Sequence, residues 1–235
     1  MKKTKRILSI DLLRIIAILS VVMIHTTMTF DDYDITSSSY FIGNIFNGLS
    51  RAGVPLFLMI SGALLLKEDR KYSVKQVFQK YVLSIVIIFA SWSFVYALQD
   101  VIRDIIGGKG LHFYHYIRAF ILGEFHMWYI YMLVGIYLTL PLLQLFVKKE
   151  NAQKIRYLII ISLVFNFLPS LISVASNILS PLAFINTPIY RVSFEFVGPY
   201  ITYLLTGYYI YNFEIKHKHL IYSRRFNNSF FNLFI

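Results

Sequence analysis

ILSIDLLRIIAILSVVMIHTTMTF, residues 7–30, is the stretch that decides the fold of this chain. It exceeds the ~20 apolar residues that cross a bilayer as a helix, yet it carries Asp11, Arg14 and His25. At roughly 100° per residue, these three side chains lie within about 60° of one another on one side of a helix. A charge near the bilayer centre costs at least ~2.5–3.5 kcal/mol. We therefore predict that this first-span stripe (Asp11, Arg14 and His25) faces a protein-lined cavity and carries function.

The composition excludes an ordinary soluble domain, because 57% of the residues are hydrophobic, only 15% are charged and the mean hydropathy is +0.60. We predict an all-α fold, a polytopic transmembrane helical bundle in a lipid bilayer, with about six spans plus the start of a seventh. The expected spans are residues 7–30, 41–66, 81–98, 124–146, 157–179 and 192–211, with FFNLFI at 230–235 as the start of the seventh. Because the chain has no cysteine, disulfides and thiolate metal sites are excluded.

The net charge of +11 follows the membrane topology and does not indicate a nucleic-acid partner. Basic residues gather in alternate loops, and the loops between them hold few cations; the basic segments are residues 2–6, 67–80, 148–156 and 216–225. Cytoplasmic loops of membrane proteins carry such an excess of lysine and arginine. We therefore expect a multi-pass protein of the cell membrane with a cytoplasmic N-terminus.

The second expected span contains RAGVPLFLMISGALLL, which starts at Arg51. Ser61 and Gly62 permit close helix approach, and packing alone could explain them. Pro55 can break the backbone hydrogen-bond ladder beside a cavity. Arg51 lies on the outer half of the span, where an arginine either snorkels to the interface or lines a site. We take Arg51 and Ser61 as candidate substrate-binding residues.

Further candidates lie toward the outer ends of later spans. His126 precedes Trp128 and a run of tyrosines typical of an interfacial aromatic belt. It is either a lone interfacial histidine or a residue that reaches the same outer cavity as His25. Glu195 is a second candidate carboxylate within the membrane, although an interfacial position would explain it too. His112 and His115 suggest a metal pair, but without an evident third ligand we expect surface histidines and no metal site.

The first-span pattern resembles that of a known family. It reads Asp11-Leu-Leu-Arg14-Ile-Ile-Ala17, followed after ten intervening residues by His25. This arrangement resembles the acyltransferase-3 family of membrane O-acyltransferases, including the members that acetylate surface polysaccharides. Three apolar segments are also similar to family motifs: PLFLMISGALL at 55–65, HMWYIYMLVGIYLTLPLL at 126–143 and TGYYIY at 206–211. One departure is that Ser84 and Ile88 stand where many members have arginine and proline.

The resemblance implies an enzyme that transfers an acyl group, commonly acetyl from acetyl-CoA, to a sugar hydroxyl of a cell-surface glycan. It implies no bound cofactor, with acyl-CoA as the donor substrate and the glycan as the acceptor. Residues 1–235 would form a single acyltransferase-3-like transmembrane domain. Because family members carry about ten spans, we expect that domain to be incomplete at its C-terminal end.

We place the catalytic roles on the first-span stripe. The ~16 Å along the helix axis between Arg14 and His25 exceeds hydrogen-bonding reach. We predict that Arg14, oriented by Asp11, holds the donor and that His25 acts as general base on the acceptor hydroxyl. Either the long arm of the donor threads between the two positions or the acyl group is relayed. Candidate substrate-binding residues are Arg51, Ser61, His126, Trp128 and Glu195. The alternatives are a membrane transporter or binding module for a small solute, and an inactive truncated remnant of the enzyme.

Overall fold

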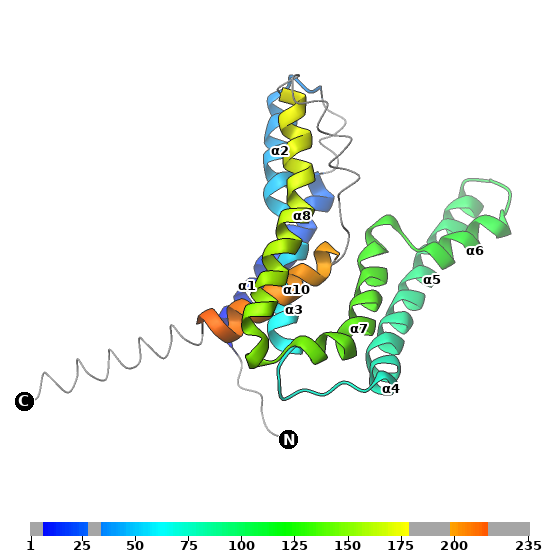
Figure 1. Ribbon diagram of the computed structural model, residues 1–235. Coiled ribbons are helices and arrows are strands. Elements are labelled where there is room, and N and C mark those ends of the chain that lie inside the picture. The colour runs from blue at the N-terminus through cyan, green and yellow to red at the C-terminus, as the bar shows by residue number, and fades with distance from the viewer. Residues whose placement is uncertain (1–6, 28–33, 179–197, 216–235) are drawn as a thin grey trace, which may run out of the picture. The chain divides into compact units, whose positions relative to one another are not determined.

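The computed structural model describes residues 7–27, 34–178 and 198–215, and every regular element within these ranges is helical. This confirms the predicted all-α class. The chain divides into two compact units: the first comprises residues 1–67 and 147–235, and the second comprises residues 68–146. Figure 1 shows their helices in chain order. Glu195 and the apolar end at 230–235 lie outside the described residues.

Among the described residues, four helical segments are long and apolar enough to span a membrane: Leu8–Thr27, Ser38–Leu65, Val74–Ile106 and Phe113–Phe146. They include the first four predicted spans, and they make the chain a multi-pass membrane protein. Two further helices lie where the fifth and sixth spans are expected, α8 (Ala152–Ile178) and α10 (Pro199–Tyr209). The count of six spans stays a prediction.

The first unit is built around α3 (Gly53–Leu65), which contacts both α1 (Leu8–Thr27) and α10. Glycines allow these close approaches. A Cβ atom added at Gly53 would lie 2.9 Å from the Ser20 Cβ on α1, and one added at Gly62 would fall on the backbone of Leu204 on α10. A Cβ at Gly207 of α10 would in turn fall on the backbone of Met59. Small residues let membrane helices pack backbone to backbone in this way.

The second span consists of two helices, α2 (Ser38–Ser50) and α3, which meet at Arg51 and Ala52. Proline has no N–H, so Pro55 cannot donate the hydrogen bond that the Arg51 carbonyl would receive in a continuous helix. The Arg51 N–H still bonds the Asn47 carbonyl at 3.2 Å, and the ladder resumes with the Leu56 N–H on the Ala52 carbonyl at 3.0 Å. The predicted break of the ladder in this span is confirmed.

The second unit begins with a long helix that changes type along its length. Its α4, π-helical η2 and α5 segments cover Val74–Gln76, Val77–Val82 and Leu83–Ile106. The third span was expected to end at residue 98, which is wrong for the helix. The helix continues for two more turns because its polar residues pair along its own surface, with Arg103 bonded to Asp100 at 3.1 Å.

Two glycines in left-handed backbone conformations shape the rest of this unit. Gly108 (φ 63°) lies in the turn that ends α5, and Gly123 (φ 65°) ends α6. Glycine adopts this conformation without the steric cost that a Cβ would add. The later helices are α6 (Phe113–Leu122), η3 (Phe125–Met127) and α7 (Trp128–Phe146), and α6 packs against α5 (Figure 1).

A side-chain clamp holds the loop before α4. The Gln144 amide of α7 accepts a hydrogen bond from the Tyr72 N–H at 2.9 Å and donates one to the Arg70 carbonyl. The Tyr72 ring is buried and meets Tyr81 edge to face at 5.7 Å. Burial raises the pKa of the Tyr72 hydroxyl, while its hydrogen bond from Arg70 lowers it. The loop is therefore ordered by one glutamine.

Replacing Gln144 by leucine should release this loop, because two backbone groups lose their partners at a cost of ~1–3 kcal/mol. We expect trypsin to cleave the detergent-solubilised protein after Arg70 and Lys71 roughly 5- to 150-fold faster. Gln99→Leu, an exposed change on α5, is the matched control. Equal cleavage rates in Gln144→Leu and the native protein would show that the clamp does not order the loop.

Candidate functional site

The axis of the candidate site is α1, which runs without a break from Leu8 to Thr27. The eleven residues from Arg14 to His25 therefore span ~16 Å along one rigid helix. This supports the predicted separation into two positions, one at Arg14 and one at His25. Two side chains so far apart along the axis cannot act as one hydrogen-bonded pair.

Arg14 and Asp11 form an ion pair one turn apart, with Arg14 Nη1 donating to Asp11 Oδ1 at 3.3 Å. The side chains are 45% and 42% exposed, respectively. An exposed pair of this kind is worth at most ~1 kcal/mol in water, so it orients the guanidinium more than it stabilises the helix. The bond uses one of the five guanidinium N–H donors. Asp11 is therefore placed to orient Arg14, as the sequence predicts.

His25 lies in the last turn of α1 and is exposed. Thr27 is only 6% exposed and points to the opposite side of the helix, about 160° away. Its hydroxyl donates to the Met23 carbonyl at 2.8 Å and to the Ile24 carbonyl at 3.0 Å. The last turn is thus anchored on the Thr27 side and presents His25 on the other. The predicted cavity around the first-span stripe stays a prediction.

A hydrogen-bonded chain ties Arg51 to the same end of α1. Arg51 Nε donates to Asn47 Oδ1 at 3.1 Å, and Asn47 Nδ2 donates to Thr27 Oγ1 at 3.2 Å. The sequence singles out Arg51 but not Asn47 or Thr27. The available signal was the spacing, since an asparagine four residues before an arginine lies on the same helix face. The structure therefore brings Arg51 and the outer end of α1 together through Asn47.

Ser61 makes a local contact. Its hydroxyl donates to the Phe57 carbonyl one turn earlier at 2.9 Å, a bond that serine commonly forms within helices. Its neighbour Gly62 forms the close approach to α10. These contacts favour the packing explanation for the Ser-Gly pair, and a substrate-binding role for Ser61 stays a prediction.

His126 and Trp128 belong to the second unit, where both are exposed. The Tyr96 hydroxyl and His126 Nε2 are 3.3 Å apart, and the two rings meet edge to face at 5.4 Å. Trp128 meets Tyr129 edge to face at 6.2 Å. These aromatic contacts fit the expected interfacial belt. The predicted substrate-binding roles of His126 and Trp128 stay predictions, as does that of Glu195.

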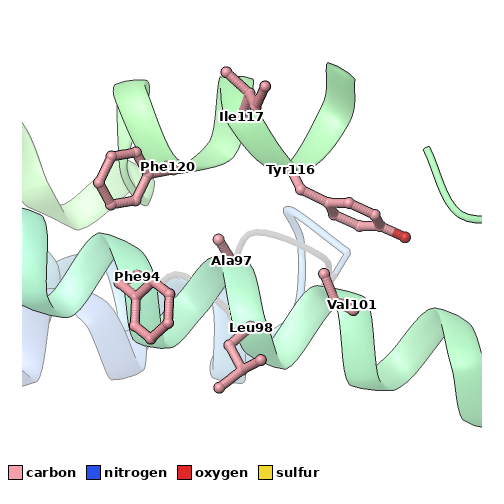
Figure 2. Close-up of a pocket in the computed structure, with 7 residues that line it drawn as sticks. All are labelled: Phe94, Ala97, Leu98, Val101, Tyr116, Ile117 and Phe120. Atoms are coloured by element: carbon pink, nitrogen blue, oxygen red, sulfur yellow. The ribbon is translucent and has the colours of Figure 1, made fainter. Parts of the chain in front are cut away.

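The second unit also holds an apolar pocket between α5 and α6 (Figure 2). Its lining residues are Phe94, Ala97, Leu98, Val101, Tyr116, Ile117 and Phe120. The polar group at its rim is the Tyr116 hydroxyl, which donates to Asp104 at 2.8 Å. The lining contains no acid, base or nucleophile suited to acyl transfer. Within the described ranges, no three histidine, aspartate or glutamate side chains are grouped to hold a metal ion.

Comparison with known proteins identifies a family. A family model described as an acyltransferase domain matches residues 7–226, which is nearly the whole chain. The comparisons with curated proteins and with solved structures gave no match. The matched range begins at the first residue of the stretch that carries Asp11, Arg14 and His25, and it includes every other candidate residue described above.

Proposed function

Because the chain belongs to the acyltransferase-3 family of membrane acyltransferases, we propose that it transfers an acyl group from acyl-CoA to a hydroxyl. The acyl group is acetyl, and the acceptor is a cell-surface polysaccharide or a lipid-linked glycan. The observation that carries this proposal is the unbroken α1, which holds a cation and an imidazole on one side, ~16 Å apart along its axis. A donor position and an acceptor position can thus face opposite sides of a membrane.

Arg14 serves the donor in this proposal. Its guanidinium is held by Asp11 at 3.3 Å and retains further donors for an anionic group or a carbonyl oxygen. With the N-terminus in the cytoplasm, Arg14 lies about 10 Å from the cytoplasmic start of α1. Acyl-CoA is a cytoplasmic metabolite, so it would reach Arg14 first. The long arm of coenzyme A then extends along α1 and presents the thioester near His25.

His25 serves the acceptor. An imidazole can take up and return a proton near physiological pH, which is what a general base for a sugar hydroxyl must do. His25 is exposed at the outer end of α1, where a glycan on the far side of the membrane can approach it. It removes the hydroxyl proton as the oxygen attacks the acyl carbon. The proton then leaves with the thiol of coenzyme A.

The test is a gene deletion in the chain's own host, complemented with the native chain, followed by counting O-acetyl groups on the surface glycan. Membranes from the complemented cells are also incubated with acetyl-CoA labelled in the acetyl group. We expect alkali-labile label in the glycan fraction from the complemented cells only. A glycan whose acetylation is unchanged by the deletion would overturn the proposal. Label or solute that crosses the membrane without becoming covalently attached would indicate a transporter.

A further inference from the structure

Arg51 is a charged residue at a break within a membrane span, and two features there call for a polar environment. Its side chain carries a permanent charge, which is costly in the hydrocarbon core unless it has a function or a path to water. Its carbonyl receives no helix bond from Pro55, which has no N–H to give. Irregular backbone at membrane depth is tolerated where it is buried in protein or lines a water-filled cavity. The pairing of both features at one residue points to a working site.

The contacts of α2 and α3 with α1 define the depth of Arg51. The Asn47 side chain bonds Thr27 at the outer end of α1, and Gly53 packs against Ser20 about two turns deeper. Arg51 lies between these contacts, so its backbone lies at about the level of residues 20–23 of α1. Helix side chains lean toward the N-terminus of their helix, and the bond from Arg51 Nε to Asn47 draws the guanidinium the same way. The guanidinium therefore lies near the level of His25.

We propose that Arg51 stabilises the negative charge that develops on the acyl carbonyl oxygen during transfer, and that Asn47 positions it. This inference rests on the proposed acyl transfer and adds the electrophilic group that the reaction needs. The acceptor oxygen forms a bond to the carbonyl carbon, its proton passes to His25, and the carbonyl electron pair moves onto oxygen. When that pair returns, the carbon–sulfur bond breaks and the thiolate of coenzyme A takes the proton from His25.

An arginine suits this role because its fork offers several donors in a fixed plane. The bond to Asn47 uses Nε, so the two terminal nitrogens are not part of it. Asn47 in turn is oriented by Thr27, whose hydroxyl accepts its amide N–H at 3.2 Å. The chain Thr27–Asn47–Arg51 therefore connects the end of α1 that carries His25 to the guanidinium. Asn47 touches no reacting atom and acts only through Arg51.

The test compares single variants of the full chain in membranes, with labelled acetyl-CoA as donor and the host surface glycan as acceptor. Arg51→Lys keeps the charge but loses the fork, and we expect kcat to fall roughly 10²- to 10³-fold, as when one oxyanion donor is removed. The KM for acetyl-CoA should stay within about threefold, because the donor is held by Arg14. Asn47→Ala should lower kcat about tenfold, the effect of losing one orienting hydrogen bond. Added guanidine should partly restore the activity of Arg51→Ala.

Two matched controls separate these effects from general damage. Asn44→Ala removes an asparagine one turn earlier on α2, whose amide donates only to the Tyr40 carbonyl of the same helix among the bonds found. Arg103→Lys changes an exposed arginine of the second unit that pairs with Asp100. Both should retain native kcat. If the native chain transfers acetyl and His25→Ala does not, but Arg51→Lys and Asn47→Ala keep native kcat, this inference is overturned alone. A native chain that transfers no acetyl overturns the proposed function and this inference together.

Discussion

Replacing His25 by alanine should lower acetyl transfer roughly 10²- to 10⁴-fold, the usual contribution of a general base. The loss should appear in kcat, because the acceptor hydroxyl then keeps its proton as it attacks. Insertion should be unaffected, since His25 is exposed and the buried anchor of the same turn is Thr27. The measurement is the initial rate of label transfer from acetyl-CoA, together with the amount of protein in the membrane fraction.

His112→Ala is the matched control for this prediction. His112 is an exposed histidine in the second unit, just before α6. We expect its removal to leave the transfer rate within twofold of the native chain. His25→Gln keeps hydrogen-bonding capacity without a titrating group, so it should be as inactive as His25→Ala. Native-like rates in either His25 variant would exclude His25 as the base, even if the chain is confirmed as an acetyltransferase.

The largest effect on stability is expected from a methyl group at the α3–α10 crossing. In Gly62→Ala the new Cβ would fall on the backbone of Leu204, which cannot rotate away as a side chain could. The two helices must separate, and buried side chains such as Leu58 and Tyr208 then lose contacts. Overpacking costs ~1–3 kcal/mol and occasionally more, and a backbone collision belongs at the upper end. Gly207→Ala should behave alike, because its Cβ would fall on the Met59 backbone.

Gly48→Ala and Gly135→Ala are the controls, since an added Cβ at either helical position meets nothing within 4 Å. Alanine favours helix over glycine by up to ~1 kcal/mol, so both controls should be as stable as the native chain or slightly more stable. The measurement is the temperature at which half of the solubilised protein is lost from the monodisperse gel-filtration peak. Equal midpoints for Gly62→Ala and Gly48→Ala would show that α3 and α10 do not touch as described.

The first helix and its stripe were predictable because they depend only on local geometry. The angle between Asp11 and Arg14 follows from about 100° per residue, and the structure confirms one helix with an ion pair between them. The same pattern indicated the acyltransferase-3 family, which the match over residues 7–226 confirms. The end of the third span was not predictable from hydropathy. The apolar run stops at residue 98, but hydrogen bonding and the Asp100–Arg103 pair carry the helix to Ile106.

What the sequence by itself determined is the all-α membrane class, the first four membrane-spanning segments, the stripe on α1 and the family. Each of these follows from composition or from spacing within one segment. Only the tertiary structure decided that Asn47 links Thr27 to Arg51, and that Gly62 and Gly207 let α3 and α10 touch. These contacts join residues far apart in the chain, and they depend on which helix faces meet. Apolar faces are interchangeable to hydropathy, so packing alone chooses which glycines and which asparagine serve the site.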